Sequence, residues 1–230
     1  MAMHKTESIE DLSRPAVAEF IGAFALTLVG VSAIAVSGDL IAIALAHGLA
    51  IGLMIAAMGH ISGGHYNPAV SFAMLVTQRI TPLRFGVYVV AQLLGAVAAA
   101  LVIKALLPAE IRDNVDFGVP TVSPALTIGQ AFVIEVIATF FLVMVIFGTA
   151  IDKRGPGMIA PLAIGLTITM DIFWAGGSTG AAMNPSRAFG PALVGRLWDD
   201  HWIYWLAPML GAAIAGILHF FILQEGKEPE

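Results

Sequence analysis

The chain has 230 residues and is too apolar for a water-soluble globule. Hydrophobic residues make up 58% and charged residues 12% of it, whereas soluble domains average about 45–50% and about 25%. This composition predicts an integral membrane protein. The net charge of −5 provides no basic excess for binding nucleic acid, and the absence of Cys excludes disulfides, Cys-ligated zinc and thiol catalysis.

Six apolar segments are long enough to cross a bilayer, which takes about 20 residues of helix. The first, residues 16–37, is longer than a signal-peptide core, so we interpret it as a retained membrane helix. A turn at Ser37-Gly38-Asp39 separates it from the second. The other four cover approximately 84–106, 128–150, 158–175 and 203–223.

Two further apolar segments, 67–77 and 184–195, have only about half the length that a span needs. Each begins with Asn-Pro, which is a favourable helix start because Asn caps the helix and Pro suits its first turn. Gly63-Gly64 and Gly176-Gly177 precede them and predict irregular backbone at membrane depth. Such backbone is tolerated only where protein buries it or where it lines a wet cavity. We therefore predict two re-entrant half-helices.

The two halves of the chain repeat each other at an offset of 116 or 117 residues, as in the pairs Glu19 with Glu135 and Asn67 with Asn184. Three spans per repeat is an odd number, so the second copy enters the bilayer inverted. The predicted fold is an all-α membrane protein with six transmembrane helices and two re-entrant half-helices.

We expect one domain over residues 1–230, with repeat one at about 16–106 and repeat two at about 128–223. Lys and Arg are more frequent on the side of the two chain ends, which predicts that both termini are cytoplasmic. We expect a multi-pass integral protein of the cell membrane.

The segments 62–70 (SGGHYNPAV) and 180–191 (GAAMNPSRAFGP) resemble the paired signatures of the aquaporin, or major intrinsic protein, family. One such motif is a weak signal, but two at matching places of an inverted repeat are specific. The resemblance covers residues 16–223. It implies a passive water channel that forms a homotetramer and needs no cofactor. The motif residues are Asn67, Pro68, Ala69, Asn184, Pro185 and Ser186, the last standing where the family usually has Ala.

The half-helices have a physical purpose that follows from their arrangement. Two helix N-termini that meet at mid-membrane place partial positive charges there, which repel cations and protons. The amide NH2 groups of Asn67 and Asn184 are expected to point at the lumen as donors. A water molecule that accepts from both turns its own hydrogens away, which interrupts a proton wire.

By the same resemblance, an outer constriction is expected at His47, Ile172, Ala181 and Arg187. Strict water channels typically have Phe at the first of these positions and His at the second. The set found here is similar instead to tonoplast-intrinsic proteins, some of which also conduct ammonia. The alternative for His47 is a histidine hydrogen-bonded between packed helices. Ala188 after the arginine, and Tyr204-Trp205 later, resemble the water branch rather than glycerol channels.

Other residues are expected to support the lumen. The extended segments before the half-helices should offer backbone carbonyls as acceptors, at Gly63, Gly64, His65, Tyr66, Gly180, Ala182 and Met183. Glu19 and Glu135 lie in apolar spans, where an unpaired carboxylate is costly. We expect them to accept backbone hydrogen bonds from the re-entrant segments, with a proton relay as the less favoured alternative. Asp171 is expected to be a structural partner near the outer mouth.

A secondary transporter is the main alternative, because transporters also use inverted repeats and broken helices. An ion-coupled transporter should carry lumen-facing acids near the midplane, and only Glu19 and Glu135 are candidates. An enzyme is less favoured, since the sequence offers no nucleophile with a base and no metal-ligand set. The expected partners are water, small neutral solutes and lipid.

Overall fold

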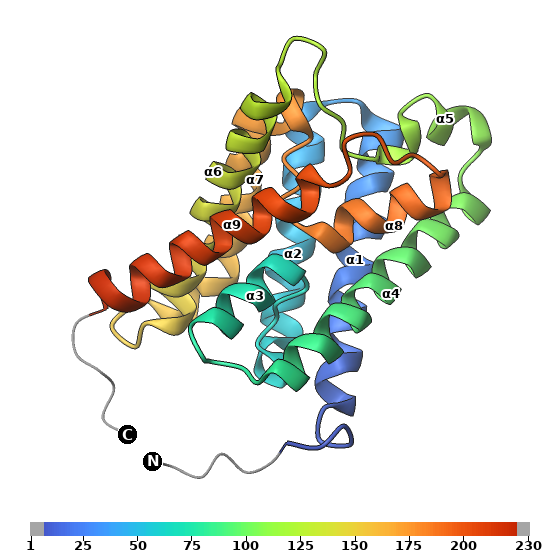
Figure 1. Cartoon of the computed structure of the whole chain (residues 1–230). Coiled ribbons are helices and arrows are strands. Elements are labelled where there is room, and N and C mark those ends of the chain that lie inside the picture. Colours follow the sequence, from blue (N-terminus) through green and yellow to red (C-terminus); the bar gives the residue numbers. More distant parts are fainter. Residues whose placement is uncertain (1–6, 225–230) are drawn as a thin grey trace.

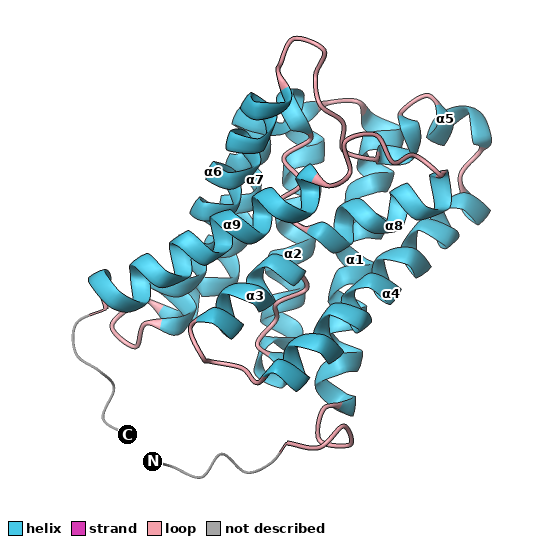
Figure 2. Cartoon of the chain, in the orientation of Figure 1, coloured by secondary structure: helices cyan, strands magenta, loops and turns pink. Residues whose placement is uncertain are grey.

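A computed structural model describes residues 7–224, which are helical throughout except for turns and loops (Figures 1 and 2). The α-helices are α1 (Ser13–Ser37), α2 (Leu40–Ser62), α3 (Pro68–Val76), α4 (Pro82–Leu106), α5 (Ala109–Asp113), α6 (Ile128–Ile146), α7 (Ala160–Thr179), α8 (Pro185–Gly195) and α9 (Ile203–Leu218). Four short helical turns are η1 (Asp116–Gly118), η2 (Phe147–Ile151), η3 (Gly157–Ile159) and η4 (His219–Leu223).

Six of these helices are long and apolar enough to cross a membrane, namely α1, α2, α4, α6 with η2, α7 with η3, and α9 with η4. The half-helices α3 and α8 have only 9 and 11 residues, and Figure 1 shows them in the middle of the molecule between the long helices. The prediction of six spans and two half-helices is confirmed.

The helices pack in two equivalent sets, which is what an inverted repeat requires. Helix α1 packs on α2 and α4, as α6 packs on α7 and α9, and α2 packs on α7 between the sets. Glycines allow the closest approaches: a Cβ on Gly95 or on Gly211 would lie closer than 3.0 Å to a backbone oxygen, that of Phe20 or that of Val136. Small residues commonly permit such helix contacts in membranes.

One boundary differs from the prediction. Gly176 and Gly177 lie inside α7, which continues to Thr179, so the irregular segment begins only at Gly180. Gly180 has φ 84°, and its repeat-one equivalent Gly63 has φ 93°. A glycine pair alone does not interrupt the hydrogen bonds of a helix. The helix ends where the chain needs a left-handed residue, which glycine adopts without strain.

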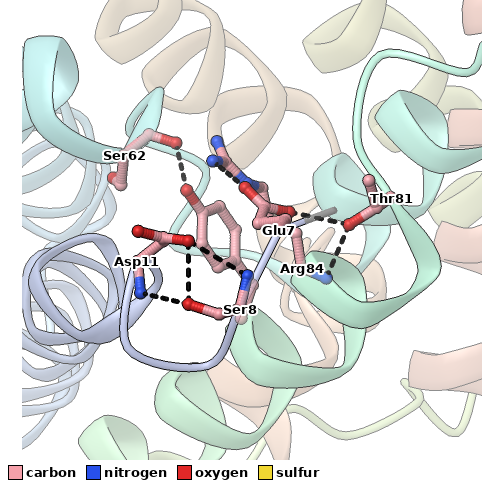
Figure 3. Close-up of polar contacts among 7 residues, drawn as sticks. Glu7, Ser8, Asp11, Ser62, Thr81 and Arg84 are labelled. Atoms are coloured by element: carbon pink, nitrogen blue, oxygen red, sulfur yellow. Dashed lines mark hydrogen bonds and ion pairs between the residues drawn. The ribbon is translucent and has the colours of Figure 1, made fainter. Parts of the chain in front are cut away.

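The segment before α1 is fastened to the start of α4 (Figure 3). The carboxylate of Glu7 accepts a hydrogen bond from Thr81 Oγ1 at 2.8 Å and one from Arg84 Nε at 2.9 Å, and it forms an ion pair with the Arg84 guanidinium. Ser8 donates from both its backbone N–H and its hydroxyl to Asp11 Oδ2. We name residues 7–11 the N-terminal clasp.

We predict that acid opens this clasp. Partial burial raises the pKa of Glu7, but the hydrogen bonds from Arg84 and Thr81 and the charge of Arg84 outweigh it, so the pKa lies below the ordinary value of 4.5. A carboxylate with a lowered pKa stabilises the folded state above its ordinary pKa, and this stabilisation is lost as the pH falls through the lowered value. A spin label on Ile9→Cys, a position that is 71% exposed, should therefore become more mobile as the pH falls through the lowered pKa of Glu7.

Glu7→Gln should give the mobile spectrum already at neutral pH, whereas Glu10→Gln, an exposed neighbour, should leave the label as it is. A label whose mobility does not change with pH, or which responds equally to both substitutions, would contradict the role of Glu7.

Candidate functional site

The two half-helices are joined end to end by their capping asparagines. Asn67 Oδ1 accepts from Ala69 N at 2.8 Å, and Asn184 Oδ1 accepts from Ser186 N at 3.0 Å and Arg187 N at 3.3 Å. These bonds satisfy N–H groups that a helix start leaves unpaired. The N-termini of α3 and α8 therefore face each other in the centre of the protein.

Each asparagine also binds the backbone that precedes the other half-helix. Asn67 Nδ2 donates to Met183 O, and Asn184 Nδ2 donates to Tyr66 O, both at 2.8 Å. An amide NH2 has two hydrogens, so one of them is occupied by this cross-link. The role of these amides as donors to the lumen stays a prediction, and it falls to the second N–H of each amide.

A cavity of about 100 Å³ runs past this junction. His47, Ile172, Ala181 and Arg187 line it together with Asn67 and Asn184, so the residues predicted at the constriction and at the half-helix junction share one cavity. The rest of the wall is largely aliphatic, with residues such as Leu26, Ile51, Leu142, Ile146, Ile164 and Ile168. A second cavity of about 390 Å³ shares His47, Ile172 and Arg187 and is also lined by loop residues 118–124.

The extended segments lie along these cavities only in part. Gly63, Gly64, His65, Ala182 and Met183 line the first cavity, and Gly180 lines the second. Tyr66 differs, because its side chain is fully buried and its hydroxyl donates to Met54 O at 3.0 Å. Pro68, Ala69, Pro185 and Ser186 are buried within the half-helices behind the wall.

The carboxylate of Glu19 holds the first re-entrant segment. It is fully buried and accepts hydrogen bonds from the backbone N–H groups of His65 at 2.9 Å and Tyr66 at 2.6 Å. The Ser62 hydroxyl and the Gln92 amide add bonds of 2.6 and 2.8 Å. Four donors therefore surround a carboxylate that has no cationic partner among the described residues.

Glu135 does the same for the second segment. It accepts from the backbone N–H groups of Ala182 and Met183, both at 2.9 Å, and from the Thr179 hydroxyl at 2.6 Å. Like Glu19 it is fully buried. Neither carboxylate is among the residues placed along the wall of the first cavity within 7–224.

Two tyrosines, whose supporting role the sequence analysis did not predict, complete this support. Tyr88 donates its hydroxyl to Ser62 O at 2.7 Å, and Tyr204 donates to Thr179 O at 2.9 Å. Both side chains are fully buried and stand 116 residues apart, the offset of the repeat. Aligning the two halves for matching aromatic residues would have identified them.

The first repeat has an additional polar chain. Gln92 Nε2 also donates to Ser71 Oγ at 3.0 Å, and Ser71 Oγ lies 3.0 Å from His65 Nδ1. The position equivalent to Gln92 in the second repeat is Pro208, which has no such group. The one sequence feature that could have indicated this series of hydrogen bonds is the single Gln in an apolar span.

The constriction residues contact one another directly. Arg187 Nη1 donates to Gly118 O at 2.8 Å, and Arg187 Nη2 lies 3.4 Å from His47 Nε2. His47 Nδ1 lies 2.8 Å from Ile43 O. Because a carbonyl only accepts, Nδ1 carries the proton and Nε2 of the neutral ring is an acceptor. His47 therefore faces Arg187 as an acceptor, and the guanidinium supplies the donor at this contact.

Asp171 lies beside the constriction rather than in it. Its side chain is fully buried, and Oδ1 accepts from Trp174 Nε1 at 3.2 Å. Asp171 is not among the described residues that line the two cavities. The residues 7–224 also contain no group of three or more His, Asp or Glu placed to hold a metal ion.

Six helices able to span a membrane, two half-helices cross-linked at their N-termini and a lined cavity past their junction define a membrane channel. Residues 5–219 match the major intrinsic protein family, and the chain belongs to this family. Members of it are passive channels for water or small solutes, so the family supports a channel and not an enzyme, and it gives no support to the transporter alternative.

Individual relatives agree with this assignment. The chain is 46% identical to the probable aquaporin TIP-type alpha of Phaseolus vulgaris over 80% of this chain and 70% of that protein. It is 37% identical to aquaporin TIP4-4 of Zea mays over 98% and 94%. The X-ray structure of the aquaglyceroporin from Plasmodium falciparum superposes with a TM-score of 0.81 at 27% identity and covers 91% of this chain and 96% of that one.

Proposed function

We propose that this channel conducts water passively and excludes protons and ions, with His47, Ile172, Ala181 and Arg187 as its selectivity filter. The observation that carries the proposal is the pair of cross-linked asparagines that line the cavity at the junction of two helix N-termini. The whole chain acts as one channel domain built from the two repeats.

Water passes because the wall offers few but well-placed polar groups. One N–H of each asparagine and the carbonyls of the extended segments replace the hydrogen bonds that water leaves in bulk, while the aliphatic wall holds water weakly. A water between Asn67 and Asn184 accepts from both, and its hydrogens then point away along the lumen. The positive ends of α3 and α8 add an electrostatic barrier to hydronium.

Water is expected to pass much faster than glycerol. The guanidinium of Arg187 and the ring of His47 occupy one side of the filter, and Ala188 and Tyr204 keep the packing behind it compact because both are fully buried. Stopped-flow shrinkage of proteoliposomes should show fast water flux that does not saturate and carries no proton current. Glycerol flux per channel comparable to water flux would contradict the assignment, and flux that saturates with a coupled ion would favour a transporter.

Ammonia is a second proposed solute, and Ile172 is the observation that favours it. Its apolar side chain lines both cavities at the filter, so the constriction is less polar than one with His at this position. His47→Phe combined with Ile172→His should lower the ammonia-to-water permeability ratio by about tenfold, the scale of change that one group makes in a shaped site. A ratio that is unchanged in a folded variant would contradict this account of the filter.

We propose a homotetramer in the cell membrane with both termini in the cytoplasm. The apolar outer surface of α2 and α7, with Leu45, Leu49, Leu162 and Leu166 exposed, supports contact with lipid or with other subunits. The orientation is supported by basic residues at the end of the molecule where the described chain begins and ends, as the contacts of Glu7 with Arg84 and of Gln224 with Arg79 indicate.

A further inference from the structure

Two acceptors hold Arg187, and both lie against consecutive residues of α1. Gly118, which accepts from Nη1, packs on Val31 so closely that a Cβ on Gly118 would lie 2.9 Å from Val31 Cγ1. His47, which faces Nη2, packs on Gly30. The middle of α1 therefore stands behind both groups that fix the guanidinium.

The imidazole of His47 occupies the space that a side chain at position 30 would need. A Cβ built on Gly30 would lie 2.5 Å from Cδ2 and 2.7 Å from Cε1 of His47, with Nε2 also in the clash. Real Cβ atoms essentially never have neighbours closer than 3.0 Å. The ring cannot tilt freely to escape, because Nδ1 donates to Ile43 O on its other edge.

In the second repeat, the position equivalent to Gly30 carries a side chain. Ile146 stands at the position equivalent to Gly30, at an offset of 116, and Ile164 at the position equivalent to His47, at an offset of 117. Both isoleucines line the first cavity. Where the first helix of the repeat carries a side chain, its partner on the second helix is aliphatic, and the glycine occurs where the partner is an imidazole.

We propose that Gly30 is a positioning residue for the filter: by having no side chain it seats His47 against Arg187 and sets the width of the outer constriction. This inference rests on the proposed function. Gly30 is buried and does not line either cavity, whereas His47 lines both. The ring thus lies between Gly30 and the lumen, and a methyl group at position 30 would push it inward and away from Arg187.

A double-mutant cycle on water permeability per channel tests the proposal. Gly30→Ala should lower permeability by about tenfold when His47 is present and should have little effect in a His47→Ala background, where no ring can be displaced. Gly86→Ala is the matched control, because it makes the same change in a membrane helix where a Cβ would meet nothing within 4 Å. A role in general packing would lower permeability in both backgrounds, and that result would overturn the proposal.

The same cycle measured on thermal stability covers two other outcomes. If Gly30→Ala alone fails to assemble, the proposal requires that Gly30→Ala with His47→Ala does assemble, and failure of both would overturn it. If the native protein conducts no water, the proposed function is wrong. The stability cycle would still decide whether Gly30 positions His47, since the steric conflict must then appear only when the ring is present.

Discussion

Glu135→Gln is expected to destabilise the protein and to abolish water conduction. Glu135 Oε1 accepts from Thr179 Oγ1 and Ala182 N, and Oε2 accepts from Met183 N. Glutamine has one oxygen and one NH2 group. In either orientation, its NH2 group faces at least one of these three donors, which then loses its acceptor. Hydrogen bonds to charged groups contribute about 1.5–3 kcal/mol each, and a buried donor left unpaired costs a similar amount. We therefore expect the free energy of unfolding to fall by about 3 kcal/mol or more.

The loss should appear as a lower unfolding temperature in detergent and as loss of water flux in proteoliposomes. Glu110→Gln, on the exposed helix α5, makes the same chemical change without a buried network and should leave both unchanged. The result also tests the proton-relay alternative for the two glutamates. A relay predicts a folded Glu135→Gln variant that still conducts water and has lost only a proton-dependent component of flux.

The roles of the two carboxylates show what sequence patterns determine well. An ionisable group that recurs at the same place in both repeats of an apolar chain has few options, because it must find donors inside the protein. The re-entrant segments are the nearest backbone with unpaired N–H groups, so their contact with Glu19 and Glu135 could be predicted. The helices could be predicted equally well, because local sequence determines them: six apolar segments are long enough to span a membrane, and two Asn-Pro pairs mark the starts of the half-helices.

The details that sequence reasoning missed depend on atoms far apart in the chain. No local pattern distinguishes Gly176-Gly177, which stay helical, from Gly180, where the helix ends. The cross-links from Asn67 to Met183 and from Asn184 to Tyr66 depend on how the half-helices dock. The acceptor role of His47 is likewise fixed by Ile43 O, one helical turn earlier, and by Arg187.

Ala181→Cys is expected to make the channel sensitive to mercurials, whereas the native protein should not respond to them directly because it has no Cys. Ala181 lines the first cavity and is 3% exposed. Alanine at this position already has a Cβ at a φ of 44°, so cysteine introduces no new backbone strain. The substitution adds one sulfur atom, and overpacking should cost little. Mercury bound to this sulfur would occupy the constriction, so nearly all water flux should be lost and should return with a reducing thiol.

The control is Leu101→Cys, at a position that is 53% exposed on the outer surface of α4. This variant should be labelled by the mercurial and should conduct normally, because its sulfur lies away from the lumen. Block of the native protein at low mercurial concentration would show an action on some group other than a thiol. An Ala181→Cys variant that is labelled but conducts as before would mean that position 181 does not line the narrowest part of the pore. Since Ala181 lies only three residues before Asn184, that outcome would also move the constriction away from Arg187 and remove the basis for assigning the filter to this end of the cavity.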